Sequence, residues 1–292
     1  VLDLRRNGGG SLQEAINLTG LFIDKGPIVQ VKDTEGGVRP YDDRDPNMVW
    51  KKPMVVLIDK FSASASEILA GAIQDYGRGL IIGDHSTHGK GTVQTVTEVG
   101  EALLGLPSTS PKYGALKITI QQFYRPDGDS TQRRGVLSDI EWPSLTTHLA
   151  DISEGDLDYA LPFDHVQGRE FHHFNMVTDP IKQQLRSLSA ARVRASEEFQ
   201  KVLKNIARYE EQKKKKYVTL NEKKFLEERA EMNADREDEK QLEELNESSS
   251  GDIKRDNYIS EALAISVDYL GMLSQGTQPG QAVQANRDTA GN

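Results

Sequence analysis

The sequence predicts an α/β fold over residues 1–150, followed by a mainly helical region. In the first part, short runs of β-branched residues alternate with segments of helical periodicity, and this order favours a sheet with some parallel strands. In the second part, residues 181–250 are densely charged and contain very few Gly or Pro, as expected of helices with solvated faces. The 292 residues are enough for about two domains.

The elements of the first part follow from local patterns. An apolar strand over residues 1–4 ends in the glycine-rich turn 7–10, and Ser11 with Glu14 forms a capping box that begins a helix over about residues 12–23. Apolar residues at helical spacing predict a second helix over residues 64–76. Further strands are predicted at residues 27–31, 53–59, 80–82, 92–99 and 115–124.

Composition divides the second part into three segments. We expect residues 151–180 to form a loose connector, residues 181–275 a charged helical domain, and residues 276–292 a flexible tail. Leu185, Val193, Phe199 and Ile206 belong to a discontinuous apolar face in the helical domain. A last helix is predicted over residues 259–273.

Composition also excludes several classes of function. The net charge of −9 argues against nucleic acid as the main partner, because phosphate binding needs a clustered positive field. The chain has no cysteine, which excludes thiol catalysis and thiolate metal sites. No run approaches ~18 apolar residues, so no transmembrane segment is expected. The first residue, Val1, already lies in a predicted strand, so we expect a fragment whose true N-terminus is upstream.

The stretch 61–70 is the most informative for chemistry. It follows an apolar strand and begins a helix, and a serine at such a turn is exposed beside outward-pointing backbone N–H groups. That setting suits a nucleophile, since the same N–H groups can bind a developing oxyanion. The alternative is structural, because Ser64 with Glu67 also reads as a helix capping box.

Three candidate bases follow Ser64 in the chain: His85, His88 and Lys90. A Ser-His-Asp triad could combine Ser64 with His88 and Asp75, although nothing in the spacing favours it. The two histidines lack an identified third ligand, so they indicate a metal only weakly. Lys90 lies between two glycines near apolar segments, and a lysine acts as a base only when burial keeps it neutral.

The same loop imitates a phosphate-binding motif but departs from it twice. Five residues rather than four separate Gly83 from Gly89, and Gly91 occupies the position of the metal-binding hydroxyl. The residues that follow are typical of a strand, whereas that motif requires a helix. Nucleotide binding is therefore not expected.

Four motifs in this order resemble the C-terminal processing peptidases, and within them the tail-specific branch. They are Leu-Arg-Arg-Asn-Gly-Gly-Gly at 4–10, Ser-Ala-Ser-Ala-Ser-Glu-Ile at 62–68, Gln-Asp-Tyr-Gly-Arg at 74–78 and Gly-Lys-Gly-Thr-Val-Gln at 89–94. Residues 135–140 resemble the end-of-core motif of the family, with Ser138 replacing its proline. The resemblance covers residues 1–145 well and the charged region after 150 more weakly. It implies a crotonase/Clp-like serine protease core with a C-terminal mainly helical domain.

The resemblance also implies roles for individual residues. Ser64 would be the nucleophile and Lys90 its general base, with Gln94 orienting the lysine amine. Asp75 matches an acidic residue sometimes assigned to a charge relay, with a helix-end role as the alternative. The remaining matches are oxyanion-hole donors, Gly9 and Ala65, and supporting polar residues, Glu67 and Thr87. No cofactor and no metal are implied.

The chain departs from the family pattern in three respects. The loop from Gly83 to Lys90 is one residue longer than usual, and we expect a bulge before Thr87 to absorb the insertion. His88 stands where Phe is common. A PDZ domain and the upstream strands of the core, which the family normally carries, are not seen here, so the fragment alone is expected to be poorly active.

The resemblance therefore implies a serine endopeptidase with a Ser-Lys dyad that degrades or trims proteins from apolar, unstructured C-terminal ends. It implies a periplasmic location and an adaptor lipoprotein as a possible partner. The alternative is a non-catalytic scaffold or interaction protein on the same fold, with a dyad disabled by the inserted residue. The distance between the Ser64 hydroxyl and the Lys90 amine discriminates between the two.

Overall fold

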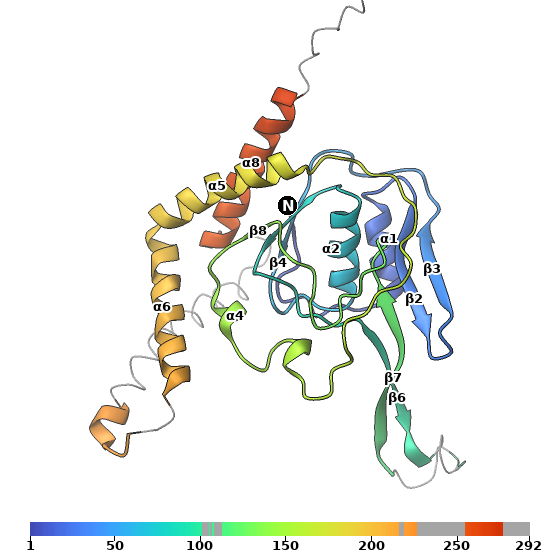
Figure 1. The fold of residues 1–292 in the computed structure, drawn as a ribbon, viewed down its shortest axis with the longest axis horizontal. Coiled ribbons are helices and arrows are strands. Elements are labelled where there is room, and N and C mark those ends of the chain that lie inside the picture. The colour runs from blue at the N-terminus through green and yellow to red at the C-terminus, as the bar shows by residue number, and fades with distance from the viewer. Residues whose placement is uncertain (101–104, 106, 108–112, 216–218, 227–254, 277–292) are drawn as a thin grey trace, which may run out of the picture.

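A computed structural model describes residues 1–100, 105, 107, 113–215, 219–226 and 255–276. Their strands form two four-stranded sheets (Figure 1). One sheet is parallel, in the order β1 (Leu2–Asp3), β4 (Val55–Ile58), β5 (Leu80–Gly83), β8 (Ile140–Glu141). The other is antiparallel, in the order β3 (Val38–Asp43), β2 (Gly26–Asp33), β7 (Ala115–Tyr124), β6 (Thr92–Glu98). The predicted α/β core with parallel pairing is thus confirmed.

The helices also follow the sequence prediction closely. In the first part they are α1 (Leu12–Gly20) and α2 (Ala65–Asp75), and the short α4 (Leu145–His148) and η1 (Glu154–Asp156) follow the core. The C-terminal part contains α5 (Asp179–Ala195), α6 (Glu197–Lys214) and α8 (Asn257–Gly276). The expected tail lies, beyond Gly276, outside the described residues. None of the helices described is long and apolar enough to cross a membrane.

The parallel sheet is apolar on both faces because helices cover both. Along β4, Val56 and Ile58 pack with α2 residues such as Leu69, whereas Val55 and Leu57 pack on the opposite side. This alternation is the two-residue period of a strand, and it explains why β4 and β5 are continuous apolar runs.

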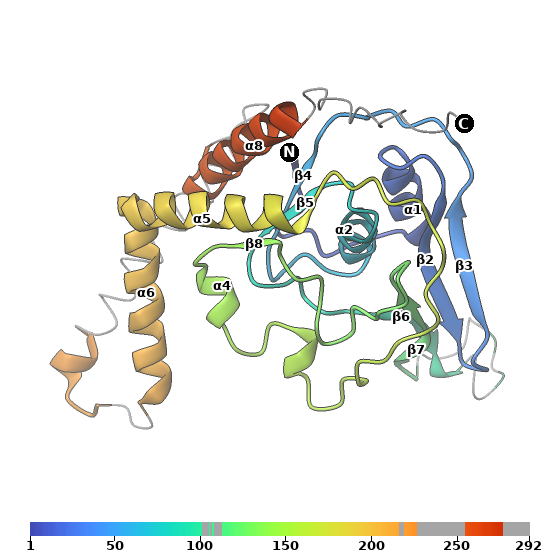
Figure 2. The same cartoon turned by 45° about the horizontal axis from the view of Figure 1, so that its top comes forward.

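The C-terminal helices supply the layer on the second face. Leu185 and Val193 of α5 and Ile265 of α8 lie in the same hydrophobic cluster as Val55 and Leu57 of the sheet. Figure 2 shows α5 and α8 on the opposite side of the sheet from α1 and α2. The helical part is thus joined to the α/β part through a shared core.

Helix α2 lies between the two sheets. Leu69 and Ile73 face the parallel sheet, and Ile68 and Ala72 face a cluster formed with α1 and β2. Because both sides of α2 are buried, its N-terminus is held in a fixed position at the carboxyl ends of the parallel strands (Figure 1).

The segment after the core wraps around it as an ordered strap. The rings of Phe171 and Tyr76 lie 4.5 Å apart, and Phe174 donates its backbone N–H to the carbonyl of Tyr76. The predicted connector 151–180 therefore contributes packing contacts of its own, which differs from the loose segment expected. Its aromatic side chains have no helical or strand period, so the local sequence does not predict that they pack against the core.

Candidate active site

Ser64 lies at the turn between β4 and α2, where the backbone is strained. Its φ is 56° and its ψ is −113°, a left-handed conformation that is uncommon for a residue other than Gly. The turn is held by Asp59, whose carboxylate accepts N–H bonds from Arg6, Phe61 and Ser62 at 2.9 to 3.0 Å. Burial raises the pKa of Asp59.

The hydroxyls of the neighbouring serines, Ser62 and Ser66, form hydrogen bonds to backbone carbonyls. The hydroxyl of Ser62 donates to the carbonyl of Leu4 at 2.8 Å, and that of Ser66 donates to the carbonyl of Asn7 at 2.9 Å. Both residues are buried, whereas Ser64 between them is half-buried. Of the three, Ser64 therefore has the exposure that a nucleophile needs.

The glycine-rich loop passes directly against this turn. A Cβ on Gly9, whose φ is +96°, would lie 2.8 Å from both the Ser64 Cβ and the Ala65 nitrogen, so only glycine fits there. Ala65 is the first residue of α2, and its N–H has no partner within the helix. The N–H of Gly9 donates to the side-chain oxygen of Asn7 at 3.0 Å. The two predicted oxyanion donors are thus adjacent, and one of them is engaged by Asn7.

A buried carboxylate joins the two halves of the predicted dyad. Glu67 Oε2 accepts the backbone N–H of Ser64 at 2.8 Å and that of Lys90 at 2.9 Å. Glu67 Oε1 accepts the Thr87 hydroxyl at 2.6 Å and the Gly89 N–H at 2.7 Å. Two backbone nitrogens that share one acceptor oxygen are necessarily close together, so Glu67 brings the Ser64 turn and the Lys90 loop into one site.

Burial dominates the titration of this carboxyl group. It raises the pKa of Glu67 from 4.5 to about 7, against the four hydrogen bonds, which favour the ionised form. A fully buried carboxylate with four donors is typical of a group that organises a site rather than one that faces solvent.

The loop before Lys90 is bonded along its length. Thr87 accepts the N–H of Val136 at 2.7 Å, and the N–H of Arg133 donates to the carbonyl of Gly89 at 2.7 Å. Gly89 has a φ of +93°, and a Cβ there would lie 2.8 Å from the backbone of Arg133. His85 is exposed at the other end of the loop. Asp84 and His85 are bonded as well, because the Asp84 N–H donates to the carbonyl of Ile58 at 3.2 Å and the Ser138 N–H donates to the carbonyl of His85 at 3.1 Å. The bulge expected before Thr87 therefore stays a prediction.

The dyad itself is open in this conformation. Within the described part of the chain, no hydrogen bond links Ser64 Oγ to Lys90 Nζ, although both residues are half-buried. Gln94 is exposed on β6, at a bulge between Val93 and Gln94. The structure therefore brings Ser64, Lys90, Glu67, Thr87, Gly9 and Ala65 together and leaves Gln94 on the adjoining strand.

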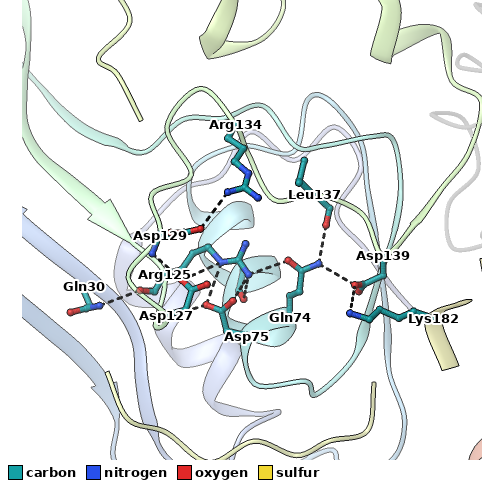
Figure 3. A network of polar contacts seen from close by, with 11 residues as sticks. Gln30, Gln74, Asp75, Arg125, Asp127, Asp129, Arg134, Leu137, Asp139 and Lys182 are labelled. Atoms are coloured by element: carbon teal, nitrogen blue, oxygen red, sulfur yellow. Dashed lines mark hydrogen bonds and ion pairs between the residues drawn. The ribbon is translucent and has the colours of Figure 1, made fainter. Parts of the chain in front are cut away.

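Asp75 lies at the opposite end of α2 from Ser64. It forms an ion pair with Arg125, and it accepts the backbone N–H of Asp127 at 3.3 Å (Figure 3). Its side chain is only 3% exposed and that of Arg125 only 14%. Burial raises the pKa of Asp75 to about 6, opposed by the attraction of Arg125. These contacts favour a structural role at the end of the helix.

The alternative triad is not assembled. His88 Nδ1 is buried and has no hydrogen-bond partner in the part of the chain that the structure describes, and Asp75 is occupied by Arg125. The other loop histidine, His85, pairs with Glu141 at 2.9 Å. Burial lowers the pKa of His88. Among the described residues, no three His, Asp or Glu side chains gather as metal ligands.

Sequence reasoning overlooked two residues that shape the site. The carbonyl of Asn7 accepts both the Ala63 N–H at 3.0 Å and the Ser66 hydroxyl, and it joins the glycine-rich loop to the serine turn. Asp59 holds the other side of that turn. The Asn-Gly sequence is a turn signal, but nothing local indicates that its carbonyl bonds to a segment more than fifty residues away.

Comparisons with known proteins agree with these motifs. Residues 1–142 match the model of peptidase family S41, and residues 147–271 match that of the C-terminal domain of tail-specific protease. The chain is 37% identical over 249 residues to a tail-specific protease of Haemophilus influenzae, covering 85% of this chain and 34% of that protein. It is 43% identical over 141 residues to a carboxy-terminal-processing protease of Bartonella bacilliformis, covering 48% and 30%.

A solved structure of a photosystem II D1 C-terminal processing protease is 34% identical, with a TM-score of 0.41, over 48% of this chain and 33% of that one. The chain spans about a third of the length of the relatives it matches. The two family models together cover nearly the whole chain, which therefore belongs to peptidase family S41 and carries the C-terminal domain of the tail-specific proteases.

Proposed function

We propose that this chain carries the nucleophile and general base of a serine endopeptidase with a Ser64–Lys90 dyad. One observation supports this most directly: Glu67 accepts the backbone N–H groups of both residues on a single carboxylate oxygen. The strained turn at Ser64 adds a second argument, because strain of this kind concentrates at functional sites.

In the proposed reaction, Lys90 removes the proton of the Ser64 hydroxyl as the oxygen attacks a substrate carbonyl. The N–H groups of Ala65 and Gly9 then stabilise the negative charge on the carbonyl oxygen. Gly9 can do so only after the side chain of Asn7 turns away, since Asn7 accepts its N–H in this conformation. The dyad also has to close from its present open arrangement, as is common for a site without substrate.

The substrates we propose are proteins with apolar, unstructured C-terminal ends, by analogy with the carboxy-terminal-processing and tail-specific relatives. A periplasmic location, with an adaptor lipoprotein as a possible partner, belongs to the same proposal. No cofactor is needed, because Lys90 supplies the base and the backbone N–H groups stabilise the oxyanion. Gln94 is proposed to orient the Lys90 amine once the dyad closes.

The test is degradation of an unfolded protein by the full-length enzyme and by its Ser64→Ala variant. We expect Ser64→Ala to abolish cleavage while keeping the fold. Ser66→Ala is the matched control, because it removes a hydroxyl two residues away whose hydrogen bond, among the described residues, is to the carbonyl of Asn7. If Ser66→Ala is dead and Ser64→Ala is active, the assignment of the nucleophile is wrong.

A second candidate function is a non-catalytic interaction protein on the same fold. It is favoured by the open dyad and by the occupied Gly9 N–H. The same experiment decides between the two, because a scaffold would leave wild type and Ser64→Ala equally inactive on the substrate.

A further inference from the structure

An ion pair links the C-terminal helix α8 to the loop that carries Gly9. The guanidinium of Arg5 donates to Asp256 Oδ2 at 2.7 Å, and it also binds Asp3 through Nε and Nη2 at 2.8 to 3.2 Å. The side chains of Arg5 and Asp256 are 21% and 24% exposed, so this pair is mostly shielded from solvent. Residues 251 positions apart thus meet at the segment that leads into the glycine-rich loop.

Asp256 performs two functions with its two oxygens. While Oδ2 binds Arg5, Oδ1 accepts the backbone N–H of Ile259 at 2.6 Å. The carbonyl of Asp256 also accepts the N–H of Ser260 at 3.0 Å. Asp256 is therefore the cap of α8, and the first turn of that helix is fixed by the residue that holds Arg5.

The helix α8 is itself rigidly attached. Ala262 and Tyr269 are buried against β4 and β5, and Tyr258 donates its hydroxyl to the carbonyl of Pro143 at 3.0 Å. Arg192 of α5 binds both Glu261 and Asp268 of α8. A fixed helix end is a suitable support for a loop that is otherwise exposed.

The loop needs such a support because glycines make up much of it. Gly8, Gly9 and Gly10 follow Arg5 within five positions, and glycine has the highest backbone entropy to lose on ordering. Backbone bonds from Arg6 to Asp59 and from Ala63 to Asn7 join this stretch to the serine turn, and the Arg5 side chain adds a contact to the start of α8. Its contact with Asp256 restricts the segment that places the Gly9 N–H beside Ser64.

We infer that Arg5 and Asp256 are a positioning pair through which the C-terminal helix α8 holds the glycine-rich loop in register for catalysis. The inference rests on the proposed protease function. Neither residue touches the reacting atoms, and both act through the placement of Gly9. The C-terminal domain thereby has a direct part in assembling the active site.

The test variant is Asp256→Asn in the full-length enzyme. Asparagine caps a helix as well as aspartate does, so the bond to Ile259 is kept while the charge facing Arg5 is removed. We expect kcat to fall about tenfold with KM unchanged, less than the 10²–10³ that follows loss of a whole oxyanion donor. Hydrogen exchange at the amides of residues 6–10 should become faster.

The matched control is Asp268→Asn, on the same helix. It removes an ion pair of the same length, 2.7 Å to Arg192, that has no link to the loop. We expect wild-type kcat and unchanged exchange in the loop. The double variant Arg5→Met with Asp256→Asn should lose no more than Arg5→Met alone, because the two residues act as one unit.

Equal kcat for Asp256→Asn and wild type would overturn the inference, as would equal losses in Asp256→Asn and Asp268→Asn. Failure of the proposed function gives a different result, namely that wild type and Ser64→Ala are equally inactive. The exchange measurement remains informative in that case, because it does not need turnover.

Discussion

At the scale of single residues, Glu67 is the group on which the arrangement of the site depends most. Its two oxygens accept four donors, from Ser64, Thr87, Gly89 and Lys90. In Glu67→Gln one of these oxygens becomes an NH2 group that would face two donors. Leaving a buried donor unsatisfied costs about 1–3 kcal/mol each, so we expect a loss of roughly 2–6 kcal/mol in the free energy of unfolding.

Chemical denaturation measures this loss, and Thr87→Val is the comparison, because it removes only one of the four donors to the carboxylate. A Glu67→Gln variant as stable as Thr87→Val would show that the carboxylate is not the organising group. Activity should fall in Glu67→Gln as well, since Ser64 and Lys90 lose their common acceptor.

The pKa of Glu67 also predicts a pH dependence of stability. The folded-state pKa of about 7 lies above the ordinary value of 4.5, so folding favours the protonated form. The contribution of this group to stability is then fully present below about pH 4.5 and is lost as the pH rises to about 7. The shift corresponds to roughly 3 kcal/mol.

Unfolding curves from pH 4 to pH 8 for wild type and Glu67→Gln would reveal this, because the variant cannot titrate at residue 67. The stability difference between wild type and variant should decrease with rising pH. A difference that stays constant over this range would contradict the raised pKa.

Replacing Lys90 separates a lysine base from a histidine base. We expect Lys90→Arg and Lys90→Ala to be inactive, because guanidinium stays protonated at any usable pH and alanine has no base. His88→Ala should remain substantially active, since His88 Nδ1 has no partner in the described residues and Asp75 is bound elsewhere. Initial rates on one unfolded substrate between pH 6 and pH 10 would measure this. An inactive His88→Ala beside an active Lys90→Ala would reverse the assignment.

At the scale of elements, the two ends of α2 have different roles, one in the proposed site and one in stability. Its N-terminus presents Ser64, while its C-terminus is fixed by the pair of Asp75 and Arg125 (Figure 3). In Asp75→Asn the buried guanidinium keeps only the longer ion pair with Asp127, at 3.9 Å, so we expect a loss of about 3–5 kcal/mol in the free energy of unfolding. Activity per folded molecule should be close to wild type when assayed well below the melting temperature.

The double variant Asp75→Asn with Arg125→Met provides the control, because it removes the buried charge as well and should recover part of the stability. If Asp75→Asn were fully folded yet inactive, Asp75 would belong to the catalytic machinery after all.

Each element that was predicted from the sequence has a recognisable pattern within its own residues. The strands β4, β5 and β7 are apolar or β-branched runs, and α2 has an apolar period and a capping residue. The strand β3 was overlooked because it is an edge strand with exposed polar residues and contains Pro40, which ordinarily argues against a strand.

The features of the fold and of the site that escaped prediction depend on contacts between distant segments. Arg78 is 1% exposed because it donates to the carbonyls of Phe22, Trp50 and Lys52. The bond of Asn7 to Ser66 and that of Arg5 to Asp256 likewise join segments far apart in the chain. Rules based on sequence spacing describe residues that are close in the chain, so contacts of this kind are seen only in the folded structure.

At the scale of the whole molecule, the shared core predicts that the helical part and the α/β part unfold together. Leu185 of α5 is fully buried against the parallel sheet, so Leu185→Ala should cost about 2–5 kcal/mol. Leu188 lies on the same helix but is 38% exposed, and Leu188→Ala should cost much less. Calorimetry should show one transition that shifts in the first variant and barely moves in the second. Two separate transitions, with only one affected by Leu185→Ala, would mean that the helices form an independent unit.

The burial of Trp142 at this junction gives the molecule a built-in optical reporter. Trp142 is 2% exposed, its Nε1 donates to Ser189 of α5 at 3.1 Å, and its ring lies 6.0 Å from that of Tyr258. The other tryptophan of the chain, Trp50, is 44% exposed. Undocking of the C-terminal helices would expose the indole of Trp142 to water, so its emission would shift to longer wavelength. In a Trp50→Phe background, the wavelength of the Trp142 fluorescence emission would therefore report whether the C-terminal helices are attached, without an added label.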